Sequence, residues 1–197
     1  LFEKIQTAIQ PEVYFEVGAG DASSCLRLHQ SLPKSRIIAF EGNPLIAESA
    51  AMNLAEMDGR FDYRVKVIDS RDGDRMFFCD NRDGQSRLTP QEKCNSGIEQ
   101  GIEKRLKTIS FANFCRGERL THKIRSVRIN THKMLYDILQ GMEDMLFYSA
   151  SLYLTIPSMV RSSAEWTPYD LIMTLNEGNF MPVARDFPEA PYYRMIF

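Results

Sequence analysis

The fold is decided by the stretch Val13-Tyr14-Phe15-Glu16-Val17-Gly18-Ala19-Gly20-Asp21-Ala22-Ser23. It begins as an apolar run that contains one acidic residue, Glu16, and then turns through Gly18 and Gly20. Glycines at such a turn let the backbone approach a ligand closely, because they have no Cβ. In doubly wound sheets this turn lies at the carboxyl end of the first strand, where nucleotide-containing ligands bind. The stretch therefore predicts a buried strand, a glycine turn and a ligand site beside it.

A second apolar run, Arg36-Ile37-Ile38-Ala39-Phe40, also ends at an acidic residue. This residue is Glu41, which follows Glu16 by 25 positions. In nucleotide-binding βαβ units, an acidic residue about 20 positions beyond the glycine turn accepts hydrogen bonds from the ribose. Glu41 is therefore a candidate ribose ligand. Its presence weakens the simpler alternative that Gly18 and Gly20 only form a tight strand–helix turn.

Composition and charge set limits on the class of protein. The chain has 197 residues, of which 44% are hydrophobic and 25% charged, as in ordinary globular proteins. We expect one domain over residues 1–197. The net charge of −2 gives no global reason to expect nucleic acid or an anionic membrane as a partner. There is no apolar run of the ~20 residues needed to span a bilayer, no signal-peptide pattern and no C-x-x-C pair. We therefore expect a cytoplasmic protein with reduced cysteines.

Strand and helix patterns alternate along the first third of the chain. A helix is predicted over residues 1–11, where Pro11 ends it, and the first strand is predicted over Val13–Val17. The elements predicted next are a helix over Ala22–Leu32, a strand over Ser35–Phe40, a helix from Asn43 to about Met57, and a strand over Tyr63–Ile68. Short connections between such elements favour an α/β fold with a mostly parallel, doubly wound, Rossmann-like sheet.

Residues 69–115 interrupt this alternation. The sequence predicts a turn at Arg71–Asp74, a strand over Arg75–Cys79, and a long polar loop over Asp80–Gly101. It then predicts a short strand over Lys107–Ser110 and a helix over Phe111–Cys115. We interpret the segment as an inserted hairpin and loop.

The remaining residues return to the α/β pattern. Predicted elements are a strand over Arg125–Ile129, an amphipathic helix over Met134–Met145, a strand over Leu152–Ile156, a helix over Thr167–Gly178, and strands over Phe180–Ala184 and Tyr192–Phe197. Because the last two strands are close in sequence, they are expected to pair as an antiparallel hairpin at the end of the sheet.

The residue types favour one class of cofactor over another. Dinucleotide-binding turns have a third glycine where this chain has Ala22. An acidic strand end suits a cationic amino-acid group or a ribose hydroxyl better than a pyrophosphate. S-adenosylmethionine therefore fits the turn better than NAD, and Ala22 and the closing hairpin disfavour a nicotinamide-dependent oxidoreductase. No His, Cys, Asp or Glu cluster has metal-ligand spacing, so we predict no metal site.

Several segments of the chain resemble a known family. The segments Glu16-Val17-Gly18-Ala19-Gly20-Asp21-Ala22-Ser23-Ser24-Cys25 and Ala39-Phe40-Glu41-Gly42-Asn43-Pro44 are similar to D-V-G-A-N-x-G-x-x-S and A-F-E-P-N-P of the FkbM family of S-adenosylmethionine-dependent methyltransferases. Thr108–Phe114 resembles the family's T-x-L-D-x-F segment, and Val127–Gly141 resembles its K-I-D-x-x-G-x-E-x-x-V-L-K-G core. The resemblance extends from about Val13 to about Phe187.

The resemblance implies methyl transfer from S-adenosylmethionine to a hydroxyl oxygen of a small molecule or glycan. It implies that Glu16, Gly18 and Gly20 contact the methionine end of the cofactor and that Glu41 binds the ribose. Asp69 or Ser70, after the third strand, would lie near the adenine.

The chain departs from the family's pattern at the methyl-transfer side. Asn130, Lys133 and Leu135 stand where the family has Asp, Gly and Glu. An amide does not take up a proton from a hydroxyl, so with Asn130 the base would come from elsewhere. The nearest candidate is His132, for which a solvent-facing position at a helix start is the alternative. These departures also keep open a catalytically inactive, methyltransferase-like binding or scaffold domain.

Overall fold

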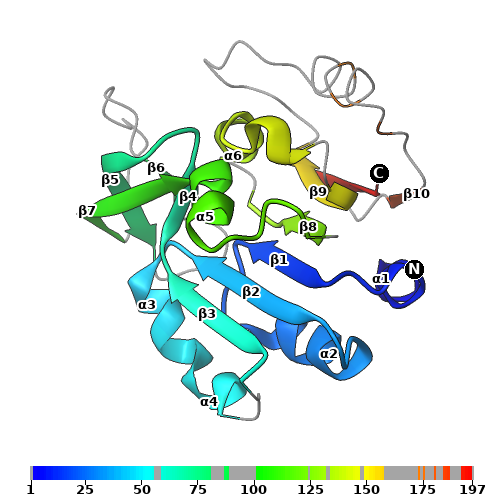
Figure 1. Ribbon diagram of the computed structural model, residues 1–197. Coiled ribbons are helices and arrows are strands. Elements are labelled where there is room, and N and C mark those ends of the chain that lie inside the picture. The colour runs from blue at the N-terminus through cyan, green and yellow to red at the C-terminus, as the bar shows by residue number, and fades with distance from the viewer. Residues whose placement is uncertain are drawn as a thin grey trace.

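The computed structural model describes residues 2–55, 59–80, 87–88, 101–123, 125–131, 134–146, 149–157, 173, 175, 180, 184–186 and 192–196. Within them, a seven-stranded sheet has the strand order β10-β11-β9-β8-β1-β2-β3 (Figure 1). A second sheet has four strands in the order β4-β7-β5-β6. The fold is α/β, as predicted.

Five neighbouring strands of the larger sheet are parallel. They are β1 (Val13–Val17), β2 (Arg36–Glu41), β3 (Phe61–Val65), β8 (Arg125–Ile129) and β9 (Ser149–Pro157). Strand β11 (Tyr192–Ile196) then pairs antiparallel with both β9 and β10 (Ala184–Asp186). The predicted mostly parallel sheet and its antiparallel C-terminal hairpin are confirmed, although Phe180 does not belong to the first hairpin strand as predicted.

The predicted third strand, Tyr63–Ile68, is wrong as a single element. Strand β3 ends at Val65, and β4 (Val67–Asp69) pairs with β7 (Gly101–Ser110) of the second sheet. Val65 is 55% exposed whereas Val67 is 3% exposed, so the chain changes surroundings at Lys66. Local alternation does not reveal such a change of sheet, because both halves have strand character.

The smaller sheet is built around a long hairpin. Strand β5 (Gly73–Asp80) pairs antiparallel with β7 over its whole length and with the short β6 (Arg87–Leu88). The predicted strand over Lys107–Ser110 is therefore only the last part of β7. Residues 81–86 and 89–100 of the predicted loop lie outside the described residues.

The described helices cover both faces of the larger sheet (Figure 1). One face carries α5 (Phe111–Gly117), α6 (Leu135–Gln140) and the 3-10 turn η2 (Glu143–Leu146). The other carries α2 (Ser23–Ser31) and the short elements α3 (Pro44–Ala47), η1 (Glu48–Ala50) and α4 (Ala51–Leu54), while α1 (Phe2–Ile9) packs against α2. The helix predicted over Thr167–Gly178 lies outside the described residues except at Met173 and Leu175.

Two predicted helices are interrupted. The helix that begins after Asn43 is divided into α3, η1 and α4, although Asn43 caps it as expected by accepting from Leu45 N at 2.9 Å. The helix predicted over Met134–Met145 ends before Gly141. A Cβ at Gly141 would collide with the backbone carbonyl of Asp69, so close packing against β4 requires glycine there.

The core lies on both faces of the parallel strands, because successive strand residues point to opposite faces. On the α5 side, Phe15 meets Phe111 edge-on at 4.8 Å between ring centroids, and Phe40 meets Phe114 likewise at 4.8 Å. The α2 side buries a smaller cluster, which includes Tyr14. Among the described cysteines, Cys25, Cys79 and Cys115 are free and buried, as expected of reduced thiols. Within the described segments, no helix has the length and apolar character needed to cross a membrane.

Candidate functional site

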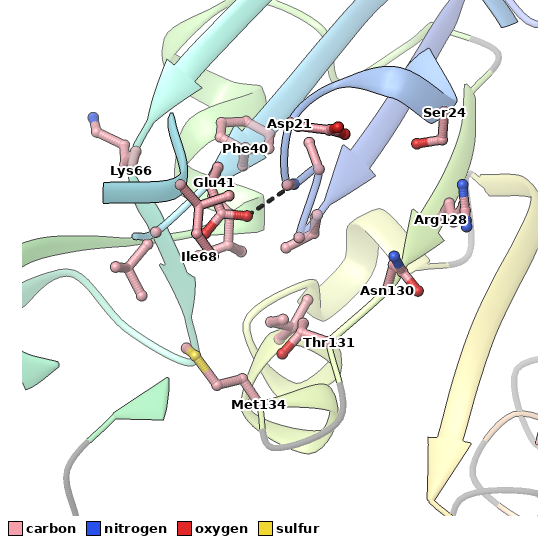
Figure 2. Close-up of a pocket in the computed structure, with 18 of the residues that line it drawn as sticks. Asp21, Ser24, Phe40, Glu41, Lys66, Ile68, Arg128, Asn130, Thr131 and Met134 are labelled. Carbon is pink, nitrogen blue, oxygen red and sulfur yellow. Dashed lines mark hydrogen bonds between the residues drawn. The ribbon is translucent and has the colours of Figure 1, made fainter. Parts of the chain in front are cut away.

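A cavity of about 380 Å³ opens at the carboxyl ends of β1, β2 and β8 (Figure 2). It is lined by the glycine turn after β1, by the residues after β2, by β4 and by the start of α6. Ligands of α/β sheets bind at this edge, and cavities of this size hold small molecules. Four of the predicted site residues line it: Gly18, Gly20, Glu41 and Asn130.

The glycine turn has a backbone that other residues adopt at a cost. Gly18 has φ +82° and Gly20 has φ +58°. A Cβ on Gly18 would stand 2.8 Å from the Asn130 carbonyl oxygen, whereas a Cβ on Gly20 would meet no atom within 4 Å. Gly18 therefore brings the ends of β1 and β8 together, while Gly20 leaves space in the cavity. Ala22 is also left-handed, at φ +65°, in the position where dinucleotide-binding turns have glycine.

Glu41 is held in the cavity wall by backbone donors. Its Oε2 accepts from Gly20 N at 2.9 Å (Figure 2), and its Oε1 accepts from Asn43 N at 2.7 Å. The residue is 8% exposed. Each carboxylate oxygen has two lone pairs, and the Glu41 carboxylate lines the cavity where a ligand hydroxyl could approach it. The turn after β1 and the end of β2 thus form one rigid unit.

Glu16 does not line the cavity. It is fully buried, with Oε2 accepting from Tyr14 Oη at 2.9 Å, and Oε1 accepting from Ser24 Oγ at 2.8 Å and Arg128 Nη1 at 2.9 Å. Burial, and then the negative charge of Glu16, raise the pKa of Tyr14 and of Cys25 well above their usual values, so both remain protonated donors. Glu16 is the acceptor at the centre of a buried group of hydrogen bonds.

Arg128 connects that buried group to the cavity, and sequence reasoning missed it. Its side chain is 14% exposed, pairs with Glu16, lies 5.3 Å from the centre of the Tyr153 ring and lines the cavity. Although burial lowers the Arg128 pKa, the Glu16 carboxylate raises it above its ordinary value. Glu16 and Arg128 are direct neighbours in the β1–β8 register. The sequence contains one signal for this residue, a charged side chain inside the predicted core strand Arg125–Ile129. The strand register that places Arg128 beside Glu16 could not be read from the sequence.

Asp69 and Ser70 are likewise absent from the cavity wall. Asp69 is fully buried, its Oδ1 accepts from Ser70 N at 2.7 Å, and its Oδ2 lies 3.5 Å from Arg75 Nε. Burial, and then the charge of Asp69, raise the pKa of Asp137 on α6. The wall beside β4 is instead apolar, and its members are Phe40, Ile46, Val67, Ile68, Phe77, Met134 and Ile138. The predicted adenine contacts of Asp69 and Ser70 stay predictions.

The residues that follow β8 are described only in part. Asn130 and Thr131 follow β8 and line the cavity, with Arg128 and Ser24 beside them (Figure 2). His132 and Lys133 lie outside the described residues. Leu135 is fully buried in the core, so the position of the family's glutamate is apolar here. Among the described residues, no group of His, Cys, Asp or Glu could hold a metal ion.

Comparison with known proteins gives likenesses in structure. No protein-family model and no curated protein sequence matches the chain. Among solved structures, TrmK from M. capricolum in complex with S-adenosyl-homocysteine aligns with a TM-score of 0.54 and 12% identity, over all of this chain and 66% of that one. The methyltransferase domain of a bacterial Hen1 has a TM-score of 0.54 and 9% identity, over all of this chain and 94% of that one.

A third structure is a precorrin-6y C5,15-methyltransferase from Geobacter metallireducens. It has a TM-score of 0.51 and 13% identity, and the alignment covers 98% of this chain and 85% of that one. At these identities the likeness concerns the fold alone. The chain has the Rossmann-like fold of methyltransferases.

Proposed function

We propose that this chain binds S-adenosylmethionine and transfers its methyl group to a hydroxyl oxygen of a small molecule or glycan, as the resemblance to the FkbM family suggests. The observation that carries the proposal is the position of Glu41, whose carboxylate is fixed in the cavity wall by Gly20 N and Asn43 N. A fixed carboxylate beside a glycine turn suits the two hydroxyls of a ribose.

The remaining cavity residues fit the other parts of that cofactor. The apolar wall of Val67, Ile68 and Phe77 offers flat packing for a purine, and the space beside Gly20 allows close approach to the backbone. Ser24, Arg128 and Asn130 give a polar end suited to an amino-acid group. When bound, S-adenosylmethionine would supply an electrophilic methyl group on its sulfonium.

The chain's own part in the reaction is orientation and proton removal. The Asn130 amide can hydrogen-bond an acceptor hydroxyl and fix its direction, because an amide has both donors and an acceptor. It cannot take the hydroxyl proton at neutral pH, and we assign that step to His132. The apolar wall excludes water from the other end of the cavity.

Calorimetric titration tests the cofactor. S-adenosylmethionine and S-adenosylhomocysteine should bind with micromolar affinity and NAD should not bind. In Glu41→Gln, the side-chain NH2 group would face one of the two backbone N–H groups that now donate to Glu41. That N–H would lose its acceptor, so the affinity for S-adenosylmethionine should fall roughly 10-fold or more. Glu48→Gln, an exposed change on η1, is the matched control and should leave affinity unchanged. Absence of S-adenosylmethionine binding in the folded protein would refute the proposal.

A second candidate function is a cofactor-binding domain without turnover, favoured by the buried Leu135 at the family's glutamate position. Transfer of labelled methyl groups to a panel of small-molecule and glycan hydroxyls distinguishes the two. An enzyme should turn over, and Asn130→Asp should change its rate. A binding domain should show no turnover in either form. NAD binding in place of S-adenosylmethionine would instead favour the nicotinamide-dependent oxidoreductase.

A further inference from the structure

We infer that Arg128 recognises the carboxylate of the cofactor's amino-acid end, and that Glu16 is a positioning residue that holds the Arg128 guanidinium instead of binding the cofactor's ammonium. The inference rests on the proposed function, because it concerns how that cofactor is selected. It reassigns the role that the sequence predicts for Glu16.

Glu16 is buried behind protein donors and does not face the cavity. An ionised carboxylate has about four lone-pair sites. Tyr14, Ser24 and Arg128 donate to Glu16 at 2.8–2.9 Å and occupy most of these sites. The side chain is fully buried and is not part of the cavity wall. An ammonium group in the cavity would therefore have to displace one of these buried donors to reach it.

Arg128 has the opposite placement. Its guanidinium is oriented by Glu16 on one side and by the Tyr153 ring on another, and its side chain lines the cavity beside Ser24 and Asn130 (Figure 2). A guanidinium has five donors in a planar fork that matches a carboxylate, and Arg128 donates to Glu16 through Nη1. With the Glu16 charge compensated inside the protein, Arg128 places a hydrogen-bond-donating cation in the cavity wall.

The two assignments predict opposite ligand preferences. If Arg128 makes the charged contact, the ligand's carboxylate matters more than its ammonium. If Glu16 makes it, the ammonium matters more. The comparison needs no variant, since analogues of S-adenosylhomocysteine can lose either group separately.

The experiment is calorimetric titration of the whole chain with S-adenosylhomocysteine, its decarboxylated analogue, its deaminated analogue and methylthioadenosine, which lacks the amino-acid end. Removal of the carboxylate should weaken binding by roughly 10- to 100-fold, the range for a charge-assisted hydrogen bond. Removal of the ammonium should weaken it less than about 3-fold, a smaller loss than one such bond gives. A larger loss on deamination than on decarboxylation overturns the inference but leaves the proposed function intact. If S-adenosylhomocysteine itself does not bind, both are overturned.

Arg128→Lys separates recognition from structural support. Lysine keeps the positive charge beside Glu16 but loses the planar fork. Affinity for S-adenosylhomocysteine should fall roughly 10-fold while affinity for the decarboxylated analogue stays the same. Equal losses for both ligands would mean that Arg128 acts only through the fold, and would contradict the inference. Arg116→Lys, at an exposed position, is the matched control and should change neither affinity.

Discussion

The glycine turn offers a test in which two similar substitutions should fail in different ways. Gly18 and Gly20 both have positive φ, and both line the cavity. Replacement by alanine should cost each about 1–2 kcal/mol of folding free energy, because a Cβ disfavours the left-handed backbone. Only at Gly18 does the new Cβ also meet a backbone atom, the Asn130 carbonyl oxygen at 2.8 Å.

That contact sets the size of the difference. Backbone cannot rotate away as a side chain can, so β1 and β8 must shift at a cost of about 1–3 kcal/mol for overpacking. For a chain of this size, 1 kcal/mol changes Tm by about 2–4 °C. Gly20→Ala should therefore lower Tm by about 2–8 °C, and Gly18→Ala should lower it by a further 2–12 °C or so.

Ligand binding should separate the pair again. The Gly20 Cβ would project into open cavity space, so Gly20→Ala should weaken S-adenosylhomocysteine binding by roughly 10-fold or more, as overpacking of a ligand site does. Scanning calorimetry and titration on both variants measure the two effects. Equal Tm losses in Gly18→Ala and Gly20→Ala would refute the close approach of β1 and β8, and unchanged affinity in Gly20→Ala would refute the position of the ligand.

Three further results are expected. The pKa of Asp137 is raised in the folded protein, so the charge of this carboxylate lowers stability at pH values above that pKa. Asp137→Asn should therefore raise Tm at pH 7, and the gain should vanish below about pH 4. A lower Tm of the variant at pH 7 would contradict this. Hydrogen bonds from Arg64 lower the Asp62 pKa, which gives stability that is present above about pH 4 and lost at lower pH. Arg64→Met should therefore lower Tm at pH 7 by about 2–4 °C and by less at pH 3, with the exposed Arg116→Met as control. Gly141→Ala should unfold the protein at lower temperature than Gly20→Ala, since its Cβ would strike the Asp69 carbonyl; equal Tm values in a thermal scan would count against that packing.

Much of the larger sheet could be predicted because its signals are local. Each apolar run, in β1, β2 and β8, is contained in five or six consecutive residues, and the turn residues Gly18 and Asn43 follow β1 and β2 within two positions. Because successive residues of each run are apolar, both faces of the sheet must be covered at that strand, which is typical of parallel strands. The strand bounds at Val13–Val17 and Arg125–Ile129 match the prediction for this reason.

The missed features depend on contacts between distant residues. Lys66 divides β3 from β4 because Val67 pairs with Thr108, which is far along the chain. The helix after Met134 ends early because the carbonyl of Asp69 approaches Gly141. Arg128 belongs to the site because parallel register brings it beside Glu16. Periodicity predicts an element's type, but not the partner that sets its end or its charge environment.

The buried pair itself argues for a role beyond stability. Replacement of a buried ion pair by well-packed apolar residues is often neutral or stabilising, so the Glu16–Arg128 contact is weak evidence that the fold needs it. Strand alternation explains how β1 can include Glu16 and still contribute to the hydrophobic core. Phe15 and Val17 pack on the α5 side of the sheet, whereas Tyr14 and Glu16 face α2. The cost of burying Glu16 is offset by the donors around it, and the result is a fixed guanidinium at one end of the cavity. A pair that adds little stability but orients a cation toward a ligand space is best explained by what that cation binds.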